Sequence, residues 1–130
     1  MTVTALAAAT FAIVVAGVIA FQTALAIGAP LGVYAMGGTS PGRFPARLRV
    51  AAAVQGAMLG LTILIVLSRA GLVLTAWSEA ARWMIWPVVA LTVVAVVLNA
   101  VTPSAAERRI WLPVTVVMLV SVLVVAVTAS

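Results

Sequence analysis

Apolar residues form four long runs along this chain, at residues 3–27, 48–67, 83–101 and 110–128. No run has an acidic or basic residue well inside its ends, and the charges gather in and beside the three short segments between the runs. A helix rises about 1.5 Å per residue, so about 20 residues cross the hydrocarbon core of a bilayer. Because backbone groups in lipid must be bonded within the segment, each run is predicted to be a membrane-spanning helix.

The composition leads to the same architecture. Of the 130 residues, 66% are hydrophobic and 7% are charged, whereas roughly a quarter of the residues of a soluble protein are charged. The four runs use up the chain, which predicts one all-α membrane domain over residues 1–130, a bundle of four transmembrane helices. A net charge of +5 would favour nucleic acid in a soluble protein. Here the few charges lie beside the spans, so we expect no nucleic-acid partner.

The arginines are divided unequally between the two sides of the predicted membrane. Five lie on the side of the first and third connecting segments: Arg43, Arg47, Arg49, Arg108 and Arg109. The other side holds Arg69, Arg82 and the two uncharged terminal segments. Since cytoplasmic loops carry the excess of basic residues, both termini are predicted to be extracytoplasmic. Abundant Ala, Val and Gly with no Lys is typical of a GC-rich bacterial genome, so the expected location is a bacterial inner membrane.

Few residue types are available for catalysis or metal binding. The chain has no Cys, His or Lys, which removes thiolate nucleophiles, imidazole bases and the usual Zn, Cu and haem ligands. Its two carboxylates both stand at predicted helix starts. Ser104 and Glu107 match a capping box, in which the Glu side chain reaches back to the Ser amide, and Ser78 with Glu79 resembles an N-cap followed by an acid. We therefore expect no catalytic residue, no cofactor and no metal site.

Small residues predict where the helices pack. The first run carries one at every fourth position from Thr4 to Gly32, and the second contains a G-x-x-x-G pattern. Small side chains let helices approach closely in lipid, so the first two helices are expected to pack more tightly than the last two. The residues expected at this contact are Ala12, Ala16, Ala20, Ala24, Gly28, Gly56 and Gly60.

Each predicted helix also places one polar side chain in the half nearer the first and third segments. These residues are Gln22, Gln55, Asn99 and Thr115. A carboxamide in hydrocarbon must find a partner, so the four are expected to meet inside the bundle. Two interpretations stay open, namely interhelical hydrogen bonds that hold the bundle together and a lined pocket or permeation site.

The stretch of residues 28–42 is rich in Gly and Pro and ends beside the arginines. Glycine permits positive φ and close backbone approach, so this stretch is either a structured turn or a loop that presents amides to a ligand. The five arginines of the first and third segments are candidates for contacts with lipid headgroups or anions, because guanidinium groups suit phosphate.

Two motifs resemble a group of small, uncharacterised four-span integral membrane proteins of bacteria. The first is Gly28-x-Pro30-x-Gly32 followed by Gly37-Gly38, and the second runs from Asn99 through Ser104, Glu107 and Arg108 to Trp111 and Pro113. The group carries no activity to transfer. The resemblance implies that the two cytoplasmic loops form one shared feature.

The function predicted from these observations is that of a small, non-enzymatic membrane protein, either a structural or accessory subunit or a homo-oligomer. Its expected partners are membrane lipids, and either a second copy of itself or a larger membrane complex. The alternative is a minimal dimeric channel or transporter for a small solute or ion.

Overall fold

The computed structural model describes all 130 residues and contains four helices of 24 residues each. They are α1 (Val3–Ala26), α2 (Ala46–Arg69), α3 (Ser78–Val101) and α4 (Ala105–Thr128). Three short 3₁₀ turns complete the structure: η1 (Gly32–Tyr34), η2 (Met36–Gly38) and η3 (Thr75–Trp77). The predicted all-α bundle is confirmed.

Apart from Ile27, which follows α1, each predicted run lies on a single helix, but three of the helices begin earlier than the apolar pattern does. Residues 83 and 110 open the third and fourth runs, whereas α3 begins at Ser78 and α4 at Ala105. A helix of 24 residues is about 36 Å long, which exceeds the hydrocarbon thickness of about 30 Å. The polar first turns therefore extend the helices into the headgroup region, which hydropathy does not detect.

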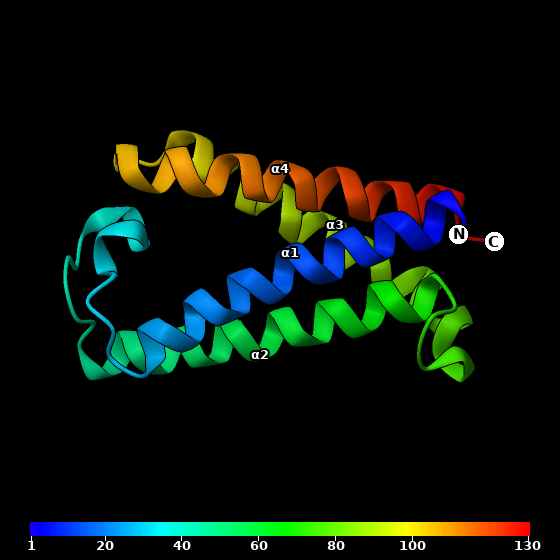
Figure 1. The fold of residues 1–130 in the computed structure, drawn as a ribbon, viewed down its shortest axis with the longest axis horizontal. Helices are drawn as coiled ribbons and strands as arrows, with labels where there is room; N and C mark the ends of the chain where they lie inside the picture. The colour runs from blue at the N-terminus through cyan, green and yellow to red at the C-terminus, as the bar shows by residue number, and fades with distance from the viewer.

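The helices run up and down, so both termini lie at one end of the bundle (Figure 1). The connection of α1 to α2, residues 27–45, is here called loop 1, and it lies at the opposite end with residues 102–104, which connect α3 to α4. We call these the termini end and the loop 1 end. The pairs α1–α2 and α3–α4 diverge toward the loop 1 end, and loop 1 lies across that end (Figure 1).

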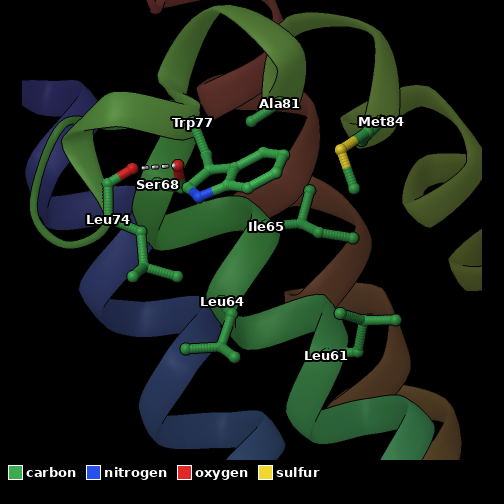
Figure 2. Close-up of a pocket in the computed structure, with 8 residues that line it drawn as sticks. All are labelled: Leu61, Leu64, Ile65, Ser68, Leu74, Trp77, Ala81 and Met84. Carbon is green, nitrogen blue, oxygen red and sulfur yellow. Dashed lines mark hydrogen bonds between the residues drawn. The ribbon is translucent and has the colours of Figure 1, made fainter.

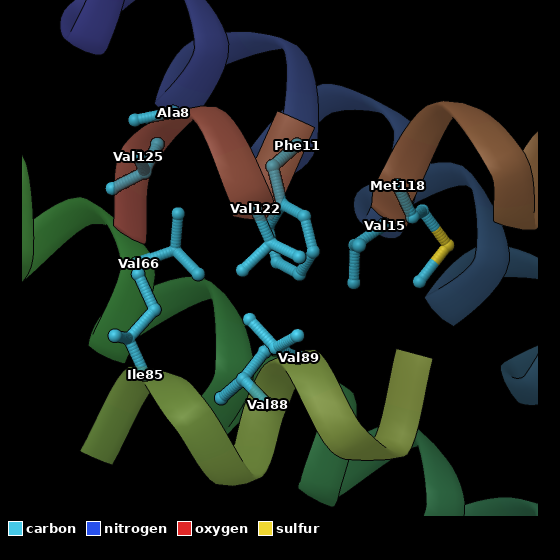
Figure 3. Close-up of a cluster of buried hydrophobic side chains, with 10 residues drawn as sticks. All are labelled: Ala8, Phe11, Val15, Val66, Ile85, Val88, Val89, Met118, Val122 and Val125. Carbon is cyan, nitrogen blue, oxygen red and sulfur yellow. The ribbon is translucent and has the colours of Figure 1, made fainter. Parts of the chain in front are cut away.

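The main hydrophobic core lies in the half of the bundle near the termini. Ten buried side chains from all four helices point toward one another there (Figure 3), namely Ala8, Phe11, Val15, Val66, Ile85, Val88, Val89, Met118, Val122 and Val125. A smaller cluster of Leu25, Phe44 and Ala52 joins α1, α2 and loop 1 at the other end. On α3, no residue beyond Thr92 is buried. Buried side chains from all four helices are thus concentrated in the half of the bundle near the termini.

Helices α1 and α2 share the most extensive contact of any helix pair, as expected, but part of the predicted small-residue ridge does not contribute to it. Ala16 and Ala20 are exposed, while Ala12, Ala24 and Gly28 are half-buried. A spacing of four residues drifts about 40° per step on a helix with 3.6 residues per turn, so the ridge leaves the contact face.

The G-x-x-x-G pattern of α2 is likewise used only in part. A Cβ placed on Gly56 would lie 3.7 Å from the Cβ of Gln22, whereas one placed on Gly60 would meet nothing within 4 Å. The prediction that Gly60 lies at the contact is therefore wrong. The buried face of α1 is formed instead by residues such as Ala8, Phe11 and Val15, which are spaced three and four residues apart.

Candidate functional site at the loop 1 end

Loop 1 folds back on itself around Gly32. The amide of Gly32 donates to the carbonyl of Gly42 over 2.9 Å, and a Cβ at Gly32 would lie 1.8 Å from the carbonyl oxygen of Ser40. Only glycine allows this approach. Three consecutive residues, Met36, Gly37 and Gly38, then adopt φ values of 52°, 68° and 75°, which turns the chain toward α4.

Loop 1 is joined to the start of α4 by three hydrogen bonds. The Gly37 amide donates to the Glu107 carboxylate over 2.8 Å, and the indole N–H of Trp111 donates to the carbonyl of Tyr34 over 2.8 Å. The third bond runs from the Ser104 hydroxyl to the carbonyl of Val33, at 3.3 Å. Loop 1 therefore lies beside Ser104 at the start of α4, and the amide of Gly37 is occupied by the protein itself.

The capping box at the start of α4 forms only in part. Ser104 Oγ accepts from the amide of Glu107 at 3.2 Å, as expected of the N-cap. The Glu107 side chain does not reach back to Ser104, whose amide donates instead to Thr102 Oγ1 at 3.3 Å. Loop 1 provides the Gly37 amide, a partner distant in sequence that local spacing cannot reveal. The carboxylate thus connects loop 1 to α4.

At the start of α3 the expected N-cap is not present. Residue Trp77 occupies the N-cap position without a side-chain hydrogen bond, while the Ser78 hydroxyl donates to the carbonyl of Arg69 at 3.5 Å. Glu79 forms an exposed ion pair with Arg82 at 3.6 Å. Surface pairs of this kind contribute little.

Gln22 and Gln55 meet, as the sequence predicts. Gln22 Nε2 donates to Gln55 Oε1 over 2.9 Å. Gln55 falls in register with Ala52 and Thr62, which are buried residues of α2, and Gln22 with Val15 and Leu25 on α1. Gln55 is nevertheless exposed and Gln22 half-buried.

Asn99 and Thr115 do not join this pair. The Asn99 amide donates to the carbonyl of Ala95, and the Thr115 hydroxyl donates to the carbonyls of Trp111 and Leu112. Each of the two side chains therefore bonds within its own helix. The expectation of one four-residue cluster is wrong, because short polar side chains can satisfy themselves on the preceding turn.

The five arginines of the loop 1 end differ in their contacts. Arg49 Nε donates to the carbonyl of Ala26 at the end of α1, and Arg108 Nη1 donates to the carbonyl of Thr102 after α3, both over 2.8 Å. Cations at helix C-termini complement the helix dipole. Arg43 lies beside Gly28, where a Cβ would come within 2.8 Å of its Nε. Arg47 and Arg109 are exposed.

Arg69 is the polar residue that sequence reasoning missed. The side chain is 7% exposed and donates to the carbonyls of Ser78 and Ala129, each over 3.2 Å. It thereby connects the end of α2 with the start of α3 and the end of α4. The negative ends of the dipoles of α2 and α4 stabilise this cation without a carboxylate. Nothing in the sequence indicates this role, because Arg69 lies two residues beyond the end of the predicted apolar run.

A pocket of about 150 Å³ opens at the termini end between α2, η3 and α3 (Figure 2). Seven of its eight lining residues are hydrophobic: Leu61, Leu64, Ile65, Leu74, Trp77, Ala81 and Met84. The eighth, Ser68, donates its hydroxyl to the carbonyl of Leu74 over 2.9 Å, the bond drawn in Figure 2. This pocket presents no polar group to a solute.

The fold and these sites define the chain as a multi-pass membrane protein, with four helices long and apolar enough to span a bilayer. Comparison with protein-family models, curated proteins and solved structures finds no match. The resemblance to small four-span bacterial proteins stays a prediction. Any functional conclusion therefore depends on the residues themselves.

Proposed function

We propose that this protein is a non-enzymatic membrane subunit that assembles with a second copy of itself through the α2 face carrying Gln55. The observation that carries the proposal is the exposed Gln22–Gln55 pair. Gln55 lies nine residues after Ala46, the first residue of α2, so it stands about 10 Å inside the hydrocarbon if the helix is centred in the bilayer. An exposed carboxamide at that depth requires a polar partner.

A second copy would satisfy the pair. Their one shared bond uses a single donor, Gln22 Nε2, and a single acceptor, Gln55 Oε1. The other groups are Gln22 Oε1, a further acceptor, and Gln55 Nε2, which carries two donor hydrogens. Because carboxamides are self-complementary, two copies related by a two-fold axis can exchange these bonds. Acyl chains cannot.

The available acid and base groups support a non-enzymatic role. Glu107 is bonded to loop 1, and Glu79 is paired with Arg82 at the other end of the bundle. The two carboxylates are thus held at opposite ends, and a general acid and base must act on one substrate together.

Cysteine crosslinking tests the assembly, because the chain has no cysteine of its own. Met58 is one turn from Gln55 and 52% exposed, and Val120 on α4 is a control of similar exposure at 56%. Met58→Cys is expected to form a disulfide-linked dimer on oxidation in native membranes, and Val120→Cys is expected to stay monomeric. Adding Gln55→Leu to Met58→Cys should abolish the dimer. Equal crosslinking at both positions, or crosslinking that survives Gln55→Leu, would refute the proposal.

A minimal dimeric channel or transporter is the second candidate, favoured by the same carboxamides at hydrocarbon depth. Within one copy, the ten-residue core fills the termini end with apolar side chains, so a permeation path would run between copies. Proteoliposomes distinguish the two functions. An ion or solute leak that depends on Gln55 would favour transport, and sealed liposomes containing crosslinked dimers would favour the subunit role.

A further inference from the structure

A second hollow lies at the loop 1 end, on the contact between α1 and α2. It has a volume of about 320 Å³ and is lined by Ala26, Ala46, Arg49, Val50 and Ala53. Three of the five lining side chains are alanines, which keep the groove open between the helices. Arg49 supplies the only charge.

Arg49 is held in place while most of its hydrogen-bond donors stay unused by the protein. Its Nε donates to the carbonyl of Ala26 over 2.8 Å, and this bond fixes the guanidinium beside the groove. No hydrogen bond within the protein uses its two terminal nitrogens, and no carboxylate lies within ion-pair distance. A planar guanidinium whose terminal edge is available matches the oxygens of a phosphate.

The charged end of the groove lies near the membrane surface and its apolar end lies deeper in the bilayer. Arg49 is in the first turn of α2, at the level where headgroups meet hydrocarbon, whereas Val50 and Ala53 lie on the side of the bilayer interior. Long basic side chains reach toward the headgroups from such positions. Arg43 and Arg47 are exposed at the same end and make it strongly basic.

We propose that this groove binds an anionic phospholipid of the leaflet that contains loop 1, with the phosphate on Arg49 and the upper part of an acyl chain along Val50 and Ala53. The basic side chain at the polar end and the small apolar side chains at the deeper end match the two parts of that lipid. The site goes beyond the proposed self-association, because α2 carries the groove and Gln55 at different positions around its axis.

Thermal melting of the full chain, followed by tryptophan fluorescence in detergent micelles, tests the site. Phosphatidylglycerol is expected to raise the melting temperature of the wild type, with phosphatidylcholine and inorganic phosphate having little effect. The Arg49→Gln variant is expected to bind phosphatidylglycerol about fivefold more weakly than the wild type, because a basic residue near an anionic surface contributes roughly that factor. Ala53→Phe should also remove the response, since an exposed position on the groove can be filled without disturbing the core.

Arg109→Gln is the matched control, because Arg109 is exposed at the same end but does not line the groove. The control should keep the full phosphatidylglycerol response. An equal loss in Arg109→Gln would show general electrostatic attraction, and an equal response to inorganic phosphate would show an anion site without a lipid. Either result, or an unchanged response in both groove variants, would overturn the proposal. Because none of these variants changes Gln55, crosslinking through Met58→Cys can fail independently of them.

Discussion

Single residues determine the conformation of the connections more than that of the helices. Gly32 shows this most clearly, because a methyl group there would overlap the backbone of residue 40. Gly17, in the middle of α1, has nothing within 4 Å of the place where its Cβ would stand. A side chain is therefore excluded at Gly32 but has free space at Gly17.

Replacing these glycines by alanine should therefore have opposite effects. Gly32→Ala is expected to destabilise the fold by about 3 kcal/mol, because backbone must move to make room. Gly17→Ala should stabilise α1 by about 0.5–1 kcal/mol, since glycine is unfavourable inside a helix. Chemical denaturation of both variants in the same detergent measures the difference. A Gly32→Ala protein as stable as the wild type would contradict the close approach of residues 32 and 40.

Arg69, the last residue of α2, is another single residue that determines how parts of the chain are joined. Its guanidinium is buried and bonds to the carbonyl of Ser78, the first residue of α3, and to that of Ala129, which follows α4. A count of charges per loop treats it as an ordinary surface cation. Its side chain instead connects three helices, which explains how a charge can be buried where no acid is near.

At the scale of elements, loop 1 is a structured part of the bundle. It contributes Phe44 to the second cluster and contacts α4 through Glu107 and Trp111. The ring of Trp111 also packs on Phe21 of α1, with ring centroids 4.6 Å apart. These contacts hold the diverging helix pairs together at the loop 1 end, where the hydrophobic core is thin.

Removing the Glu107 carboxylate should loosen loop 1 without unfolding the bundle. Glu107→Ala is expected to speed hydrogen exchange of the Gly37 amide by at least about tenfold, because a hydrogen bond to a charged group contributes about 1.5–3 kcal/mol. Glu107→Gln should keep most of the protection, since its oxygen can still accept. Glu79→Ala serves as the control at the exposed carboxylate. Unchanged exchange at Gly37 in Glu107→Ala would show that loop 1 is held by other contacts.

At the scale of the whole molecule, positive charge is divided unequally between the two ends of the bundle. The structure places both termini at one end, where the hydroxyls of Thr4 and Thr128 are 2.6 Å apart, and five of the seven arginines at or near the other. At the termini end, Arg69 is buried and Arg82 is paired with Glu79. The freely exposed positive charge is therefore concentrated at the loop 1 end.

This asymmetry predicts that the termini are extracytoplasmic, because the basic end of a membrane protein stays in the cytoplasm. Alkaline phosphatase fused to the C-terminus should be active in bacterial cells, and a fluorescent protein fused there should be dark. Arg47→Glu with Arg109→Glu weakens the bias and is expected to reduce phosphatase activity. The opposite pattern in the unmodified chain, with a bright fluorescent fusion and inactive phosphatase, would reverse the orientation.

The sequence by itself determined the number, type and membrane-spanning parts of the helices. Apolar length and the need to satisfy backbone groups in lipid are local properties, so hydropathy was sufficient for them. It also indicated that Gln22 and Gln55 meet, because two long carboxamides on neighbouring helices must find each other in hydrocarbon.

Only the tertiary structure decided which surfaces those helices use. How the helices cross decides which residues of the α1 ridge lie at the contact and why no neighbour lies near Gly60. Where loop 1 folds decides that Glu107 bonds to Gly37. The same holds for Arg69, whose hydrogen-bond partners are carbonyls that packing brings to it. Contacts between residues distant in sequence leave no regular spacing in the chain, and the functional proposals made for this protein depend on such contacts.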